Sequence, residues 1–313
     1  MWKSARAMML GAFAVAALAL PAMAQTVGLG TTKGGATAQI ANAIASVVSA
    51  AGEVQVRPQV SANTSQYIPL VNAGRLEFGI ANYPQTHYAV EGTGMSSKAN
   101  PDLRVVAALF PFKAGILVPV ELGVTSFADL AGRNVPRFPD GSLGDFIIRA
   151  ALNAGGLTYA DVSEVPIANF PRMFDAVKQG QTDISIAAIG SKPTYDIEAA
   201  VGEISFIPFG DGDEAKVTEL LPGASLQDIA ASDELPGLDD GSRVFAYDYL
   251  LFAHKDVSDD VVTKVLTALF EGEEGLKATS PLWRDYDPAK IGKALRLDYH
   301  PAAAAFHKAN GGG

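Results

Sequence analysis

Three observations predict an α/β protein with two similar lobes. Helix and strand patterns alternate from Val27 onward. The order of strand, glycine turn and helix occurs twice along the chain. One spaced signature also occurs twice, as V-x-x-G-x-x-E-x-x-I from Val71 and as V-x-x-G-x-x-D-x-x-I from Val177. Each copy alone is a common helix-to-strand connection, but the shared order around both favours two related lobes.

The first lobe is expected to begin with a strand, a glycine-rich turn and a helix. Apolar residues at i, i+4, i+7 and i+8 from Ile40 predict that helix, which ends at Gly52. A short strand at 54–56 follows. Side-chain oxygens in Asn63-Thr64-Ser65 can cap a second helix at 66–72. Alternation at 76–80 then predicts a half-buried strand.

The second lobe repeats this plan. A strand at 135–138 leads through the turn Pro139-Asp140-Gly141 to a helix at 143–154. Ser142 is the expected cap of that helix, with Asp145 as the return partner. The remaining elements expected are a strand at 163–168, a helix from Asn169-Phe170-Pro171 to Gly180, and a strand at 184–186.

Two long apolar segments, Leu103–Val118 and Val244–His254, fit inside neither lobe and flank the second copy. Paired strands that cross between two lobes would have this pattern. The amphipathic helix at 261–270 is expected to return to the first lobe, with Asp256–Asp260 supplying its cap and a negative first turn. The expected lobes are therefore residues 25–114 with 245–313, and residues 115–244.

Residues 1–24 are predicted to be a secretory signal peptide. Lys3 and Arg6 form a basic start, an apolar run follows to Leu20, and Ala22-Met23-Ala24 is a small-x-small cleavage site. A membrane anchor is the alternative, but the run is shorter than the roughly 20 apolar residues that span a bilayer. Cleavage would remove two basic residues and change the net charge from −10 to −12. The expected location is the periplasm.

The composition excludes several classes of function. The acidic balance disfavours nucleic-acid binding, which needs a basic footprint. The chain has no cysteine, so disulfides, cysteine catalysis, zinc–thiolate sites and a lipid anchor on an N-terminal cysteine are all excluded. We expect a protein that is not anchored in the membrane and needs neither a metal nor a cofactor.

The glycine-rich stretch at 28–35 resembles two nucleotide motifs but completes neither. Lys33 stands where a dinucleotide fingerprint needs its third glycine, and alanine follows Gly35 where a phosphate loop needs lysine. What remains is a turn with hydroxyls at Thr31 and Thr32 and a helix N-terminus, whose free N–H groups favour an anion. A plain capped turn is the alternative.

Two other predicted helix N-termini, at Asn63–Ser65 and at Gly141–Ser142, resemble the one that follows the glycine-rich turn. If two lobes face each other, all three starts would point donors into one cleft, because ligands bind outside the carboxyl ends of strands in such sheets. Among the aromatic residues, Tyr83, Phe170 and Tyr247 are candidates for stacking on a ligand or for hydrogen bonding to it. Ordinary packing is the alternative for each.

Motifs for catalysis are absent. The segment Asp140–Gly144 lacks the first glycine of G-x-S-x-G. The four histidines include no pair at the i, i+4 spacing of a helical metal site. We therefore expect no enzyme activity, although a secreted hydrolase that uses Ser142 stays open as a distant alternative.

Several short motifs carry a resemblance to a known family. They are Gly30–Gly35, Tyr67–Gly74, Phe78–Asn82, Asp129–Arg133, Ala246–Phe252 and Tyr299–Ala303. Together, in this order, they resemble the TAXI-type solute receptors of tripartite ATP-independent periplasmic (TRAP) transporters. The resemblance implies a two-lobed, type II periplasmic-binding-protein-like α/β fold with two crossing strands as hinge. It also implies a monomer that captures a small organic anion, such as a glutamate-like or dicarboxylate anion, and delivers it to integral membrane subunits.

The resemblance implies ligand contacts by Thr31, Thr32 and Ser142, while Arg137 and Asp140 make the second-lobe loop more charged than the family pattern. Closure is expected near Gly115 and Tyr247. Together with the candidates above, the predicted ligand-binding residues are Thr31, Thr32, Lys33, Gly34, Asn63, Thr64, Ser65, Asn82, Tyr83, Arg137, Ser142, Phe170 and Tyr247. A receptor for an ATP-driven importer or for a sensor kinase, built on the same scaffold, remains the main alternative.

Overall fold

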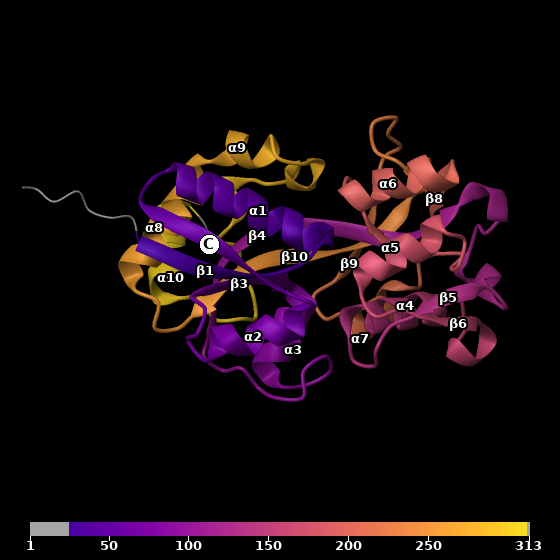
Figure 1. The fold of residues 1–313 in the computed structure, drawn as a ribbon, viewed down its shortest axis with the longest axis horizontal. Helices are drawn as coiled ribbons and strands as arrows, with labels where there is room; N and C mark the ends of the chain where they lie inside the picture. Colours follow the sequence, from indigo (N-terminus) through magenta and orange to yellow (C-terminus); the bar gives the residue numbers. More distant parts are fainter. Residues whose placement is uncertain (1–24, 312–313) are drawn as a thin grey trace, which may run out of the picture.

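Two groups of helices and strands lie side by side, and two long strands run between them (Figure 1). The computed structural model describes residues 25–311, so the predicted signal peptide lies outside the described residues. The first group, here called the first lobe, contains β1 (Gln25–Thr32), α1 (Gly35–Ala50), β2 (Val54–Ser61), α2 (Thr64–Asn72), β3 (Phe78–Asn82), α3 (Tyr83–Glu91), α8 (Asp259–Glu271), α9 (Glu273–Lys277) and α10 (Pro301–Ala309).

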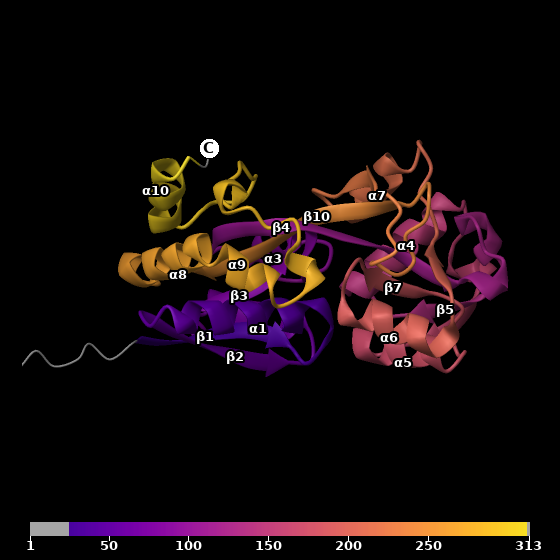
Figure 2. The same cartoon turned by 90° about the horizontal axis from the view of Figure 1, so that it is seen from above.

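The second group, here called the second lobe, follows the same order of strands and helices. It contains β5 (Asn134–Arg137), α4 (Leu143–Ala154), β6 (Ser163–Pro166), α5 (Phe170–Lys178), β7 (Ser185–Ala188), α6 (Lys192–Val201), β8 (Ile204–Phe206) and α7 (Glu214–Leu220). The two views in Figures 1 and 2 agree that this group lies at one end of the molecule and the C-terminal helices at the other.

The connecting strands are β4 (Leu103–Pro119) and β10 (Arg243–His254), which pair antiparallel. They belong to a sheet with the order β2-β1-β3-β10-β4-β7, in which β8 also pairs with β4, and β9 (Ser225–Asp228) with β10. β10 pairs with β3 of the first lobe, and β4 pairs with β7 and β8 of the second. The expected crossing strands are therefore present and tie the two lobes into one sheet.

Residues 28–82 of the first lobe and 134–188 of the second follow the same order of strands and helices at an offset of 106 residues, the distance from Val71 to Val177. α2 and α5 begin and end at positions that differ by this offset. The parallel pair β1–β2 aligns Gly28 with Arg57, and β5–β6 aligns the corresponding Asn134 with Ser163. The repeat predicted from the spaced signature therefore extends through three strands and two helices without a gap.

The acidic residue of each signature has the same structural role in both lobes. Glu77 Oε2 accepts a hydrogen bond from Gly28 N–H at 2.6 Å, and Asp183 Oδ2 accepts one from Asn134 N–H at 3.0 Å. The glycine of each signature has positive φ, 65° at Gly74 and 67° at Gly180, a conformation that glycine adopts without strain. Each signature thus ties the end of a helix to the first strand of its own lobe.

Three details differ from the sequence prediction. The strand expected at 76–80 is β3 at Phe78–Asn82, because the N–H groups of Arg75 and Leu76 still bond to Leu70 O in the preceding turn. Asn63 precedes α2 but makes no side-chain cap, since its Oδ1 accepts from the Ser65 hydroxyl instead. The third difference is that several elements were not expected, namely α3, α6, β8, α7, β9 and α10. No helix within residues 25–311 is long and apolar enough to cross a membrane.

Candidate functional site

A cleft of ≈ 630 Å³ lies between the two lobes. Its first wall comes from the turn before α1, the start of α2 and the end of β3. The opposite wall comes from the turn before α4 and the start of α5, and β4 and β10 contribute the floor. The two walls are formed by corresponding segments of the repeat, so the cleft lies between matched parts of the two lobes.

The first-lobe wall is polar. Asn82 is 2% exposed, and its side chain caps α3 by accepting from Gln85 N–H at 2.9 Å. Gln85 Oε1 accepts from Asn82 Nδ2 at 2.9 Å, and Gln85 Nε2 donates to Thr64 Oγ1. All three line the cleft. The bonds among them leave a second amide hydrogen on each of Asn82 and Gln85, and the Thr64 hydroxyl hydrogen, as donors.

Two helix N-termini in this wall lack a side-chain cap. The N-cap residues are Gly34 for α1 and Asn63 for α2, and neither helix has an acidic residue in its first turn. The first N–H groups of a helix need partners and carry the positive end of its dipole. They make this wall suited to an anion.

The second-lobe wall is mainly apolar. Phe138, Leu143, Ile147, Phe170 and Phe174 line it. The rings of Phe138 and Phe170 lie 5.2 Å apart, and those of Phe170 and Phe174 lie 6.4 Å apart. This wall offers apolar surface to whatever occupies the cleft.

Two of the helices that begin at this second wall, α4 and α5, are capped by their own sequence. Ser142 Oγ accepts from Asp145 N–H at 3.4 Å, as predicted, and Asn169 Oδ1 accepts from Arg172 N–H at 3.1 Å. Asp145 Oδ2 accepts from Gly141 N–H at 3.2 Å rather than from Ser142 N–H. A third helix, α6, begins at Ser191, which also lines the cleft, and has no side-chain cap. Fewer N–H groups are therefore left for a ligand at the starts of α4 and α5.

The floor of the cleft is aromatic and contains one hydroxyl without a partner. Tyr247 stacks on Phe112 at 5.7 Å, is 4% exposed, and has no hydrogen-bond partner for its hydroxyl among residues 25–311. Tyr249 shares a hydrogen bond with Thr37. Burial raises the pKa of both tyrosines. The Tyr247 hydroxyl thus stays protonated and can donate to a ligand.

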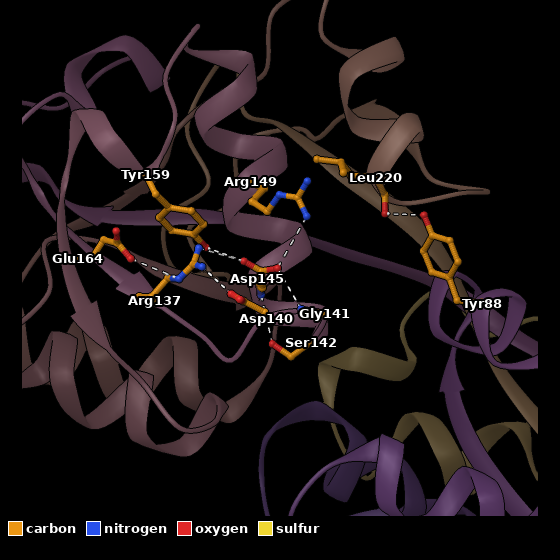
Figure 3. A network of polar contacts seen from close by, with 10 residues as sticks. All are labelled: Tyr88, Arg137, Asp140, Gly141, Ser142, Asp145, Arg149, Tyr159, Glu164 and Leu220. Atoms are coloured by element: carbon orange, nitrogen blue, oxygen red, sulfur yellow. Dashed lines mark hydrogen bonds and ion pairs between the residues drawn. The ribbon is translucent and has the colours of Figure 1, made fainter. Parts of the chain in front are cut away.

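Arg137 lies behind the second wall, in a polar network with its neighbours (Figure 3). Its guanidinium lies over the Tyr159 ring, 3.9 Å from the centroid, and pairs with Asp145 at 3.4 Å and with Glu164 at 3.3 Å. It also pairs with Asp140 at 2.5 Å. These partners hold the turn 139–142, and Arg137 does not itself line the cleft.

Of the predicted ligand-binding residues, nine line the cleft: Thr32, Gly34, Asn63, Thr64, Ser65, Asn82, Ser142, Phe170 and Tyr247. Thr31, Lys33, Tyr83 and Arg137 do not line it. Thr31 is buried, with its hydroxyl donating to Thr37 O at 3.3 Å. Tyr83 is buried against Gly223, and Lys33 is exposed beside the turn.

The sequence prediction missed several lining residues, among them Thr37, Gln85, Phe138, Asn169 and Phe174. The repeat could have indicated two of these, because Asn169 and Phe138 stand 106 residues after Asn63 and Thr32, both of which were predicted. Gln85 lies in α3, which was itself unexpected. Within residues 25–311, no cluster of three histidine, aspartate or glutamate residues could hold a metal ion.

A family model described as the NMT1-like family matches residues 29–311. The chain belongs to the NMT1-like family. This NMT1-like protein is also similar to the periplasmic aliphatic sulphonate binding protein SsuA from Escherichia coli. The identity is 17%, the TM-score is 0.53, and the match covers 91% of this chain and 90% of that one.

A second similar structure is the alkanesulfonate-binding protein SsuA from Xanthomonas axonopodis pv. citri bound to MOPS. Here the identity is 16%, the TM-score is 0.51, and the match covers 92% of this chain and 84% of that one. At such identities the likeness shows the fold. The NMT1-like protein therefore has the mixed α/β fold of a type II periplasmic binding protein.

Proposed function

We propose that this protein is a periplasmic solute-binding protein that captures a small organic anion between its lobes and releases it to a membrane transporter. The observation that carries the proposal is the cleft, in which two uncapped helix N-termini face an apolar wall. Both similar structures are of binding proteins. We therefore propose binding without catalysis.

The chemistry of the cleft supports an anion held mainly by neutral groups. The donors are backbone N–H groups at the starts of α1 and α2, the side chains of Thr64, Asn82 and Gln85, and the Tyr247 hydroxyl. Neutral donors in a desolvated site bind an anion without the cost of burying a second charge. Arg137, one of the predicted ligand-binding residues, is left out of the proposed contacts because its partners lie behind the wall.

The type of transporter is a separate part of the proposal. The TAXI-like motifs support a TRAP transporter, whereas the similarity to two sulfonate-binding SsuA proteins supports the alternative, a receptor for an ATP-driven importer, more directly. A neighbouring gene for a multi-span TRAP permease would favour the first partner. Neighbouring genes for an ATPase and its permease would favour the second.

The proposed lobes are residues 25–114 with 245–313, and residues 115–244. The boundary at 114/115 coincides with the point where β4 begins to pair with β7. Gly115 allows a close approach there, since an added Cβ would lie 2.9 Å from Phe206 Cδ1 and 3.0 Å from Val244 Cγ1. We propose that the monomer closes by bending near this point.

A binding screen tests the function. The protein is unfolded and refolded to remove any ligand carried over, and carboxylates, sulfonates, phosphonates and amino acids are then assayed by thermal shift and calorimetry. A true ligand at about 100 times its Kd adds about 2.7 kcal/mol to the unfolding free energy. If no anion binds at micromolar to millimolar concentration, the proposal fails. Turnover of a bound compound that is lost in Ser142→Ala would favour the hydrolase instead.

A further inference from the structure

We propose that the ligand is an amphipathic monoanion, with its charged group on the first lobe and an apolar part of several carbons on the second. This inference rests on the proposed function and adds the class and the orientation of the ligand. It does not follow from the fold, because the two lobes are copies of each other and a symmetric dianion would suit two equal walls.

Matched positions of the repeat show that the walls are not equal. At five pairs of lining positions, each separated by 106 residues, the first lobe has a polar residue and the second an apolar one. These pairs are Thr32 and Phe138, Thr37 and Leu143, Thr64 and Phe170, Ser65 and Pro171, and Asn82 and Ala188. Two pairs, Gly34 with Asp140 and Ala36 with Ser142, have the polar residue in the second lobe. A ligand that contacts both walls therefore meets mainly hydrogen-bonding groups on one side and mainly apolar groups on the other.

The helix starts differ in the same direction. In the first lobe, α1 and α2 have no side-chain cap, whereas their counterparts α4 and α5 are capped by Ser142 and Asn169. α4 also has Asp145 in its first turn, which opposes a second anion there. In these two matched pairs of helices, the uncapped starts and the more favourable dipole ends belong to the first lobe, whereas in the second lobe the uncapped start at the cleft is that of α6, at Ser191.

The charged side chains agree with this orientation. Among the described residues that line the cleft, the cation is Lys98 in the first lobe, and the anion is Asp140 in the second. Asp140 is 85% exposed and pairs with Arg137, so it screens that cation from the cleft. A carboxylate or sulfonate at the second wall would meet Asp140, and one at the first wall would meet donors.

The floor and the volume fit a ligand with an apolar part. Tyr247 combines an aromatic ring with an unpartnered hydroxyl, and Phe112 stacks beside it. A volume of ≈ 630 Å³ is typical of sites that enclose a ligand well above the size of acetate. A compact, fully charged ligand would leave the phenylalanines of the second wall without an apolar partner.

The test compares anions matched in length. Hexanoate has one charged end, adipate has the same number of carbons and two charged ends, and acetate is a charged group alone; 1-hexanesulfonate and methanesulfonate repeat the comparison with a sulfonate. Calorimetry on the refolded full chain should give hexanoate or hexanesulfonate at least about 10-fold tighter binding than the matched short anion, because each buried methylene strengthens binding several-fold. Adipate should bind at least about 10-fold more weakly than hexanoate.

The outcomes separate this inference from the function on which it rests. If adipate or acetate binds as tightly as hexanoate, or if the tightest ligand in the wider screen is a dianion or a zwitterion, the amphipathic assignment is overturned while the binding function stands. If no anion binds at all, both fail. A preference for hexanoate over both acetate and adipate, repeated for hexanesulfonate over methanesulfonate, supports both.

Variants that place a first-lobe residue at the matched position of the second lobe test the proposed orientation of the ligand. Phe170→Thr places the first-lobe residue on the second wall, and should weaken hexanoate about 10-fold while acetate changes less than twofold. Phe174→Ala is a second variant with the same expectation. Arg172→Thr, an exposed position on the same helix, is the control and should leave both unchanged. Thermal unfolding confirms that each variant is folded. Equal weakening of hexanoate and acetate by Phe170→Thr would contradict the orientation.

Discussion

The Tyr247 hydroxyl, at the floor of the cleft, has no hydrogen-bond partner among residues 25–311. Replacing it in Tyr247→Phe keeps the ring stacked on Phe112 and removes only the donor. We expect ligand affinity to fall about 3- to 10-fold, since a neutral hydrogen bond contributes about 0.5–1.5 kcal/mol. The unfolding free energy of the ligand-free protein should not fall. Calorimetry with the tightest ligand from the screen, and urea denaturation without it, measure the two effects.

Tyr249→Phe is the matched control for this prediction. Its hydroxyl already has a partner in Thr37, so its loss should lower the unfolding free energy. Unchanged affinity in Tyr247→Phe would contradict a ligand contact at the floor of the cleft.

Asp145 is a residue on which the second wall depends without contacting the ligand. It is 2% exposed and accepts hydrogen bonds from Gly141 N–H and from the Tyr159 hydroxyl, each at 3.2 Å, besides pairing with Arg137 (Figure 3). Asp145→Asn removes the charge from the centre of this network and leaves Arg137 without its buried partner. The unfolding free energy should fall by about 2–4 kcal/mol in urea denaturation.

The neighbouring carboxylate provides the comparison. Asp140 also pairs with Arg137 but is 85% exposed, so Asp140→Asn should change the unfolding free energy by less than about 1 kcal/mol. Equal losses in the two variants would mean that burial does not distinguish the two ion pairs.

At the scale of elements, helix α10 is held against β4 by a buried histidine. His307 is 4% exposed, and its Nε2 lies 2.8 Å from Val106 O. Burial lowers the pKa of His307, partly opposed by this contact. The unfolded chain therefore binds a proton more readily than the folded one, so this group's contribution is complete above about pH 6.5 and is lost as the pH falls below that value.

The prediction is a fall in the unfolding free energy between pH 7 and pH 5, at most about 1.4 kcal/mol per pH unit from this one group. His307→Gln should reduce the dependence of the unfolding free energy on pH between pH 7 and pH 5. The window lies above the range in which carboxylates titrate, and urea denaturation at several pH values measures it. The same slope in His307→Gln would contradict the assignment.

The elements that the sequence predicted best are those with local signals at both ends. α4 occupies the predicted residues 143–154 because Ser142 caps its start and Gly155 follows its end. β3 begins two residues late because the turn before it extends the helix hydrogen bonds. α3 was missed because its sequence, YPQTHYAVE, has little apolar periodicity, and its cap, Asn82, also ends a strand.

Among the candidate residues of the site, those with a local sequence signal were also the easier ones to predict. The helix starts Gly34, Asn63 and Ser142 were predicted because a turn and a helix N-terminus are local features. Arg137 does not line the cleft, because Tyr159, which is 22 residues further along the chain, and Asp145 hold its side chain behind the second wall. The contrast between a polar and an apolar wall also needed the structure, since it appears only when the two copies are aligned.

On the scale of the whole molecule, the repeat explains how one cleft can have two unlike walls. The backbone is duplicated, so the strand ends and helix starts face each other across β4 and β10. Backbone roles such as those of Glu77 and Asp183 are the same in both copies. Side chains at the cleft differ, so the fold provides the site and the substitutions between copies provide its selectivity.

The lobes contact each other at the rims of the cleft, which indicates a closed arrangement. Lys192 N–H on α6 lies 3.5 Å from Gln39 Oε1 on α1, and the Tyr88 hydroxyl on α3 donates to Leu220 O on α7 at 3.3 Å. Further contacts between the lobes include the Tyr88–Phe146 ring pair and the exposed Arg284–Glu234 ion pair at 3.6 Å. An empty cleft would leave the donors of its first wall in water. We expect the ligand-free protein to open and the ligand to restore the closed form.

Distances between the lobes test this prediction directly. The chain has no cysteine, so spin labels on Asn42→Cys in α1 and Ala199→Cys in α6, both exposed positions, report one distance. Pulsed electron paramagnetic resonance should show a longer and broader distribution of distances between the labels without ligand, and a shorter and narrower distribution with it. A control pair within the first lobe, Asn42→Cys and Thr263→Cys, should not change. If the distance across the cleft is the same with and without a bound ligand, the lobes do not close on it, and recognition of a closed form by a transporter would have no basis.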